Sequence, residues 1–160
     1  MRALLIPILY AAVAWAQSTV FVVRHADRYS TEPDPSITPE GQRQAASLAL
    51  LLADTHITRI FISEALRTRQ TAAPTAERFR LMPISIVASN QEELIRQVRG
   101  GLREGEATLI VGHRGTVPKI VKALSGKDVP PLAVDEYDRL QVVTLLSHGA
   151  SSVLTLRFGH

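Results

Sequence analysis

The sequence of 160 residues contains no cysteine, which excludes disulfides, thiolate nucleophiles and cysteine-ligated metals. Aromatic residues make up only 5% of the chain, so stacking platforms for single-stranded nucleic acid are not expected. The net charge is +3, and the lysines and arginines are scattered rather than gathered into a basic segment. This modest excess fits a small anionic substrate better than nucleic acid.

The sequence also lacks an apolar run of the ~20 residues that a membrane-spanning helix requires. A shorter apolar run from Ala3 to Trp15 follows Met1 and Arg2, and Ala14-Trp15-Ala16 provides a small-x-small cleavage site. This pattern is typical of a secretory signal. We therefore expect residues 1–16 to be removed, the remainder to be exported to the periplasm or beyond, and no stable membrane insertion afterwards. An uncleaved anchor or a buried first strand is the alternative.

The remaining chain, residues 17–160, has enough apolar material for one domain, because hydrophobic residues make up 46% of the whole sequence and charged residues 21%. Strands and helices alternate along it and a hairpin closes it. This order predicts an α/β fold, a three-layer αβα sandwich whose mostly parallel central sheet gains antiparallel strands near the C-terminus. Strands are expected over 19–23, 59–62, 84–87, 108–111, 140–146 and 153–158. The last two surround a turn at 148–149.

Helices are expected after Thr38-Pro39, from about Ala65, over 89–98 and over 117–124. Proline at the first position favours the first of these helices. Pro74 is expected to interrupt the second, and Ser89 with Glu92 forms a capping-box pattern for the third.

Polar side chains follow three of the apolar strands directly. The first strand leads into Arg24-His25, the second into Ser63 and Arg67, and the fourth into His113. In parallel sheets, ligands bind beyond the carboxyl ends of the strands. These strand ends therefore predict one site containing two histidines and two arginines.

Such a cluster suits phosphoryl transfer. Arginine matches phosphate oxygens with a planar fork of donors, and a histidine can attack phosphorus through one ring nitrogen when the other nitrogen is held by an acceptor. A divalent cation held by His25, Asp27 and His113 is the alternative. Two arginines in the same pocket would repel that cation, so we expect no metal.

These residues resemble the motifs of the histidine phosphatase superfamily, the phosphoglycerate-mutase-like group. The motifs here are Arg24-His25-Ala26-Asp27, Thr38-x-x-Gly41-x-x-Gln44-Ala45, Ser63-x-x-x-Arg67-Thr68-x-Gln70-Thr71-Ala72 and Val111-Gly112-His113. The resemblance covers most of the chain between residues 20 and 124, and residues 135–139 resemble short exported bacterial members. It implies that His25 becomes phosphorylated, that Arg24, Arg67 and His113 form the phosphate pocket, and that water releases the phosphate without a metal or cofactor.

The sequence departs from larger members of that family, which carry an acidic proton donor in an insertion between the second strand and the second histidine. The nearest candidates for a general acid here are Glu92, Glu93 and Asp27. Glu92 has another explanation as the capping-box acid, and Asp27 has another as the ion-pair partner of Arg28. An acid-poor pocket suits phosphoramidates such as phosphohistidine, or aryl and acyl phosphates, because these leaving groups need less help from a proton donor.

Three further residues are candidates for substrate binding. Arg28 and Arg114 add positive charge beside the motifs, and Thr116 either binds phosphate or caps the following helix, the cap being favoured. The prediction is therefore an exported, metal-independent phosphatase for phosphomonoesters or phosphoramidates, acting on a small phosphorylated substrate or on phosphohistidine. A non-hydrolytic phosphate-binding module on the same fold is the alternative, and a lipid-associated factor held by an uncleaved N-terminus is another.

Overall fold

The computed structural model describes residues 17–30, 33–146 and 149–158. The predicted signal segment, 1–16, and His148 of the predicted turn lie outside these residues. Within the described ranges, no helix has the length and apolar character needed to cross a bilayer.

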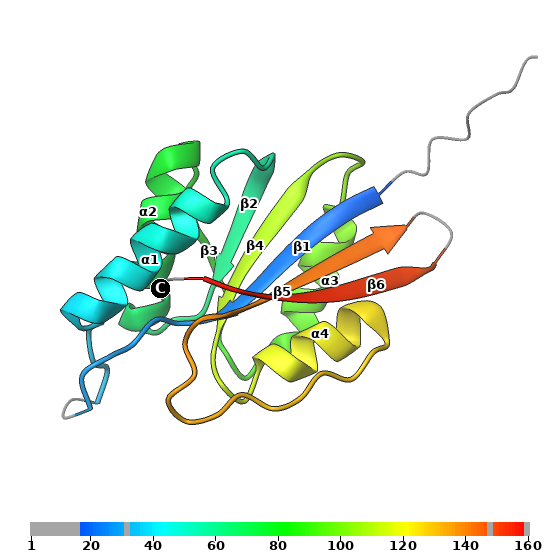
Figure 1. Cartoon of the computed structure of the whole chain (residues 1–160). Coiled ribbons are helices and arrows are strands. Elements are labelled where there is room, and N and C mark those ends of the chain that lie inside the picture. The colour runs from blue at the N-terminus through cyan, green and yellow to red at the C-terminus, as the bar shows by residue number, and fades with distance from the viewer. Residues whose placement is uncertain (1–16, 31–32, 147–148, 159–160) are drawn as a thin grey trace, which may run out of the picture.

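Six strands form one sheet in the order β3-β2-β4-β1-β5-β6 (Figure 1). Pairing is parallel among β1 to β4 and antiparallel between β1 and β5 and between β5 and β6. The predicted α/β fold with antiparallel strands near the C-terminus is confirmed. The strands are β1 (Gln17–Arg24), β2 (Ile57–Ile62), β3 (Ile84–Ser85), β4 (Ala107–Gly112), β5 (Arg139–Leu146) and β6 (Ser151–Arg157).

Helices cover both faces of the sheet (Figure 1). The helices α1 (Pro39–Leu51) and α2 (Leu66–Phe79) lie on one face, and α3 (Gln91–Gly100) and α4 (Val117–Ser125) lie on the other. Alternate residues of β1 point to opposite faces: Phe21 and Val23 join the core beneath α1 and α2, whereas Val20 and Val22 join the core beneath α3 and α4. This explains why the strand is apolar throughout.

The structure corrects the prediction that Pro74 interrupts the second helix. The helix α2 continues through Pro74 to Phe79. A proline inside a helix costs about 3 kcal/mol. Burial of Ala72, Thr75 and Ala76 against the sheet side of α2 offsets this local preference.

Two boundaries in the middle of the chain also differ from the prediction. The N-cap of α3 is Asn90, whose side chain accepts a hydrogen bond from the N–H of Glu93, so Ser89 and Glu92 do not form a capping box. The strand β3 ends at Ser85 because the chain then turns, with the N–H of Asn90 donating to the carbonyl of Val87 at 2.8 Å.

Candidate active site

Two histidines follow the adjacent strands β1 and β4 and lie side by side. Arg24 is in register with Gly112 across these strands, and the N–H of His25 donates to the carbonyl of Gly112 at 2.9 Å. The ring centroids of His25 and His113 are 5.4 Å apart. The parallel sheet thus brings the two predicted imidazoles to one edge.

The first of these rings, that of His25, is almost fully buried, with 4% of the residue exposed. Its Nδ1 lies 2.8 Å from the carbonyl oxygen of Ala26. Because a carbonyl can only accept, Nδ1 carries the proton and Nε2 keeps its lone pair. Burial, together with the nearby charge of Arg24, lowers the pKa of His25 to about 3. The ring is therefore neutral at physiological pH and has one nitrogen available as a nucleophile.

The second ring, that of His113, takes part in a directed chain of hydrogen bonds. Its Nδ1 lies 3.4 Å from Nη2 of Arg67, which can only donate, and its Nε2 lies 2.9 Å from Oγ of Ser63. The hydroxyl of Thr68 donates to the carbonyl of Ala65 at 2.7 Å, which leaves its oxygen to accept from the Ser63 hydroxyl 3.0 Å away. Ser63 can therefore accept the proton on Nε2 of His113. Burial and the charge of Arg67 lower the pKa of His113.

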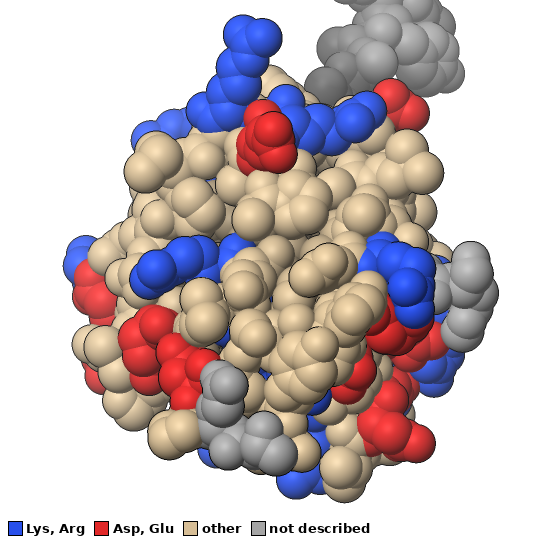
Figure 2. All heavy atoms as spheres, turned by 90° about the vertical axis from the view of Figure 1, so that its left-hand side faces the viewer, with Lys and Arg blue, Asp and Glu red and all other residues tan. Residues whose placement is uncertain are grey.

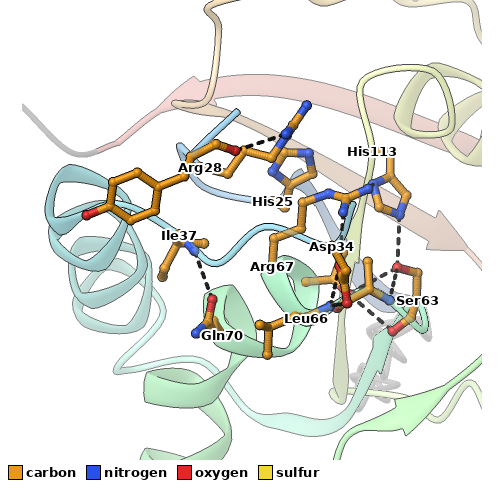
Figure 3. Close-up of polar contacts among 12 residues, drawn as sticks. His25, Arg28, Asp34, Ile37, Ser63, Leu66, Arg67, Gln70 and His113 are labelled. Atoms are coloured by element: carbon orange, nitrogen blue, oxygen red, sulfur yellow. Dashed lines mark hydrogen bonds and ion pairs between the residues drawn. The ribbon is translucent and has the colours of Figure 1, made fainter. Parts of the chain in front are cut away.

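Arg67 extends from the first turn of α2 toward His113 (Figure 3). Its Nη1 lies 3.3 Å from Oδ1 of Asp34, and the same carboxylate accepts from the N–H of Leu66 at 3.0 and 3.1 Å. Asp34 thus caps α2 from a distant loop, since the N-cap residue Ala65 makes no side-chain cap. The Nε of Arg67 is buried and has no hydrogen-bond partner among the described residues.

Arg24 is held by the loop that precedes β5. Its Nη1 donates to the carbonyls of Ala133, Val134 and Glu136 at 3.1, 2.8 and 2.9 Å. The guanidinium lies over the ring of Tyr137, 3.9 Å from its centroid, and that ring is 5.9 Å from the ring of His25. Within the described part of the chain, the Nε of Arg24 is also buried without a hydrogen-bond partner.

The three further substrate-binding candidates are placed differently. Arg28 lies beside His25, half-buried, with Nη1 donating to the carbonyl of Tyr29 (Figure 3). Arg114 is exposed, although its charge lowers the pKa of Arg24 after the larger effect of burial. Thr116 occupies the N-cap position of α4 but makes no capping hydrogen bond; its hydroxyl accepts from the N–H of His113 at 2.9 Å. The favoured capping role is therefore wrong, and Thr116 fixes the backbone of His113.

Within the described residues, none of the three predicted acids forms a hydrogen bond or ion pair with either imidazole. The carboxylate of Asp27 accepts from the hydroxyl of Thr38 at 2.7 Å instead of pairing with Arg28. Glu93 accepts from Arg96 and Gln97, and the hydrogen bond from Arg96 is the main cause of its lowered pKa. Glu92 lies exposed in the first turn of α3.

Several motif residues hold the backbone of the segment that carries His25. The N–H of Ala26 donates to Oγ1 of Thr71, and the N–H of Asp27 donates to Oε1 of Gln44, both at 2.9 Å. Thr38 caps α1 by accepting from the N–H of Gly41. The residue pattern indicated that these positions matter but gave them no role. The structure shows that α1 and α2 position the loop from the side.

Three other neighbours of the site have little or no recognisable signal in the sequence. Asp34 stands in a proline-rich stretch without a recognisable pattern, and Ser63 follows the second strand and belongs to a motif but has no predicted role. Tyr137 belongs to the charged run 135–139, which was recognised without a function. Each reaches the site across a long separation in sequence.

The site as a whole is suited to an oxyanion. Guanidinium groups whose buried Nε atoms have no hydrogen-bond partner among the described residues lie beside a neutral imidazole, and guanidinium groups bind oxyanions well. On the surface shown in Figure 2, basic and acidic side chains are interspersed and separated by uncharged residues. The charges of Arg24 and Arg67 act on both imidazoles. Among the described residues, no group of three or more His, Asp or Glu side chains is placed to hold a metal ion.

Comparisons with known proteins give one family. Residues 16–92 match the sequence profile of the histidine phosphatase superfamily (branch 1), a range that contains His25 and Arg67 but ends before His113. No curated protein sequence matches the chain.

Solved structures with the same fold are numerous. The fold is similar to that of the protein histidine phosphatase SixA complexed with tungstate (TM-score 0.65, 20% identity, covering 87% of this chain and 96% of that one). It is also similar to the SixA assigned as a phosphohistidine phosphatase in Nakamurella multipartitia (TM-score 0.64, 20% identity, 90% and 96% covered). A phosphoglycerate mutase from Plasmodium falciparum has the fold as well (TM-score 0.60, 17% identity, 87% and 89% covered).

Proposed function

We propose that the chain is a member of the histidine phosphatase superfamily, whose sequence profile matches residues 16–92, and that it is a metal-independent phosphatase that transfers a phosphoryl group to His25 and then to water. One observation carries the proposal. Nδ1 of His25 is held by the carbonyl of Ala26 while burial keeps the ring neutral, so Nε2 presents a lone pair. The charges of Arg24 and Arg67 act on this ring, and the ring of His113 lies beside it.

The reaction proceeds in two steps. In the first, the lone pair of Nε2 forms a bond to phosphorus, and the bond from phosphorus to the leaving group breaks with its electron pair going to the leaving group. In the second, a water oxygen attacks phosphorus, the P–N bond breaks, its electron pair returns to Nε2, and the proton of water passes to the released phosphate or to solvent. The guanidinium groups stabilise the charge on the equatorial oxygens.

The hydrogen bonds of the candidate general acids bear on the class of substrate. Asp27 is engaged by Thr38 and Glu93 by Arg96, so neither is free to protonate a poor leaving group. This supports phosphoramidates, of which phosphohistidine is one, and aryl or acyl phosphates in preference to alkyl phosphates. The SixA structures, named for phosphohistidine phosphatase activity, are in keeping with that class.

The decisive experiment seeks the covalent intermediate. Purified protein is mixed with p-nitrophenyl phosphate, quenched at millisecond times without acid, digested and examined by mass spectrometry. We expect one phosphoryl group on the peptide containing His25 and steady release of inorganic phosphate. His25→Ala should abolish both signals, whereas His56→Ala, an exposed histidine preceding β2, should leave both intact.

The same experiment separates the alternatives. A non-hydrolytic phosphate-binding module would give no adduct and no phosphate release, although inorganic phosphate would still raise its melting temperature. A mutase would form the adduct but pass the phosphoryl group to a second hydroxyl and not to water. Full turnover by His25→Ala would refute the proposed role of His25.

We also propose that the protein is exported after removal of residues 1–16. The positive start, the short apolar run and the small residues before Gln17 support this. Fractionation of expressing cells combined with N-terminal sequencing tests it. A periplasmic or secreted product beginning at Gln17 is expected, and a membrane-bound product retaining the apolar run would refute it.

A further inference from the structure

We propose that Glu136 is a positioning residue for the phosphate site: it shapes the loop whose carbonyls hold the guanidinium of Arg24. This inference rests on the proposed function, because it assigns Arg24 to the binding of the phosphoryl group. Glu136 itself does not touch the substrate in this account. It acts through the loop and through Arg24.

The first step concerns what holds Arg24. Its Nη1 carries two protons and lies within hydrogen-bond distance of three carbonyl oxygens, those of Ala133, Val134 and Glu136. Both protons of this nitrogen are therefore engaged in hydrogen bonds to the loop. The donors left for an oxyanion are those of Nε and Nη2, and Nε is buried with no partner among the described residues. The three carbonyls thus determine which edge of the guanidinium faces the substrate.

The second step concerns what holds the loop. The Glu136 carboxylate accepts from the N–H of Ala133 at 2.9 Å, from Nε and Nη2 of Arg139 at 2.7 Å each, and from Nη2 of Arg157 at 2.9 Å. Its side chain is only 9% exposed. Burial opposes ionisation, but the hydrogen bonds from Ala133 and Arg139 outweigh it and lower the pKa of Glu136. The carboxylate is therefore charged at neutral pH.

The third step connects the two. The side chain of Glu136 binds the N–H of Ala133, while the carbonyls of the same two residues point at Arg24. One carboxylate thereby folds the loop into the shape that presents its acceptors. Arg139 and Arg157 belong to β5 and β6, so the loop is fastened to the antiparallel part of the sheet. The position of Arg24 depends on an ion pair that lies outside the phosphate site.

A purely structural role would stabilise the fold without acting through Arg24, and a double-mutant cycle distinguishes the two. The variants are Glu136→Gln, Arg24→Lys and the double substitution, measured by kcat and KM for p-nitrophenyl phosphate and by calorimetric Kd for inorganic phosphate. We expect Glu136→Gln to lower kcat/KM by roughly tenfold to a hundredfold, the range expected for misplacement of a binding group by up to 1 Å. The double substitution should be barely worse than Arg24→Lys alone.

The matched control is Asp128→Asn, which removes the exposed ion pair with Lys122 beyond the end of α4. It should leave kcat/KM unchanged and combine additively with Arg24→Lys. Should Glu136→Gln fail to fold, Arg157→Gln removes one of the two arginines from the same carboxylate at a side chain that is 54% exposed. It should produce a smaller effect of the same kind.

Additive effects of Glu136→Gln and Arg24→Lys on kcat/KM and on the Kd for phosphate would overturn the inference. So would a Glu136→Gln protein that melts earlier but binds phosphate and turns over normally. The phosphate Kd tests the inference even if the chain does not hydrolyse phosphates. Failure of the proposed function would instead appear as a missing adduct on His25 in the wild-type protein.

Discussion

The contact between α1 and the segment that carries His25 offers a test of the proposed site. A Cβ added at Gly41 would lie 2.2 Å from the carbonyl oxygen of Asp27 and 3.0 Å from the Cβ of Ile37. Since carbon and oxygen atoms normally approach no closer than about 3.3 Å, the backbone of Asp27 would have to move by roughly 1 Å. The same carbonyl accepts a hydrogen bond from the N–H of Thr38, and Asp27 is two residues from His25.

We expect Gly41→Ala to lower kcat/KM for p-nitrophenyl phosphate by about a hundredfold, since a misplacement of 1 Å costs that much. Alanine favours the helix by up to about 1 kcal/mol, but overpacking costs about 1 to 3 kcal/mol. The free energy of unfolding in urea should therefore fall by up to about 2 kcal/mol.

The control is Gly100→Ala, at the last residue of α3, where an added Cβ meets nothing within 4 Å. This variant should keep full activity and match or exceed the wild-type free energy of unfolding. A Gly41→Ala protein as active and as stable as Gly100→Ala would refute the reasoning about the close approach.

Four further outcomes are expected. Ser63→Ala leaves the Nε2 proton of His113 without its acceptor, so kcat should fall and unfolding should become easier by about 1 to 3 kcal/mol; an unchanged kcat would contradict the proposed hydrogen-bond chain. The pKa of His25 is about 3 in the folded protein against an ordinary value near 6.5, so on acidification the unfolded protein binds a proton at this residue before the folded protein does. The free energy of unfolding should therefore decrease as the pH falls from about 6.5 toward 3. The decrease should be smaller in His25→Asn. Pro74→Ala should raise the free energy of unfolding by about 1 to 2 kcal/mol, measured by urea denaturation, and a decrease would show that the ring packs better than a helical alanine. Incubation with EDTA should leave the rate of hydrolysis unchanged, and a loss of activity restored by a divalent metal would support the metal alternative.

The parts of the fold that were predicted from sequence are those with a local signal. The run Val20–Val23 is apolar at every position because both faces of β1 are covered, and this is visible in the residues themselves. The placement of His25 and His113 side by side was likewise predictable, since each directly follows a parallel strand. By contrast, Pro74 was misread because its cost within α2 is offset by packing that local propensity does not contain.

The residues that hold the site could not be predicted in the same way. Arg24 meets Ala133 and Glu136, which lie 109 and 112 residues later in the chain. Asp34 reaches the start of α2 across a separation of 32 residues. Such contacts depend on the tertiary arrangement of the loops. Periodicity and capping patterns describe only local structure and do not predict that arrangement.

The pairing of β1 with β4 has a consequence for how such a protein can diversify. The distance between the two imidazoles is determined by the pairing of neighbouring strands, in which Arg24 lies opposite Gly112. It does not depend on the segments that connect the strands. Insertions into the connections between these strands can therefore reshape the surroundings of the site while the rings of His25 and His113 keep their distance. The sheet determines the spacing of the two rings, and the surrounding loops can vary in length and sequence without changing that spacing.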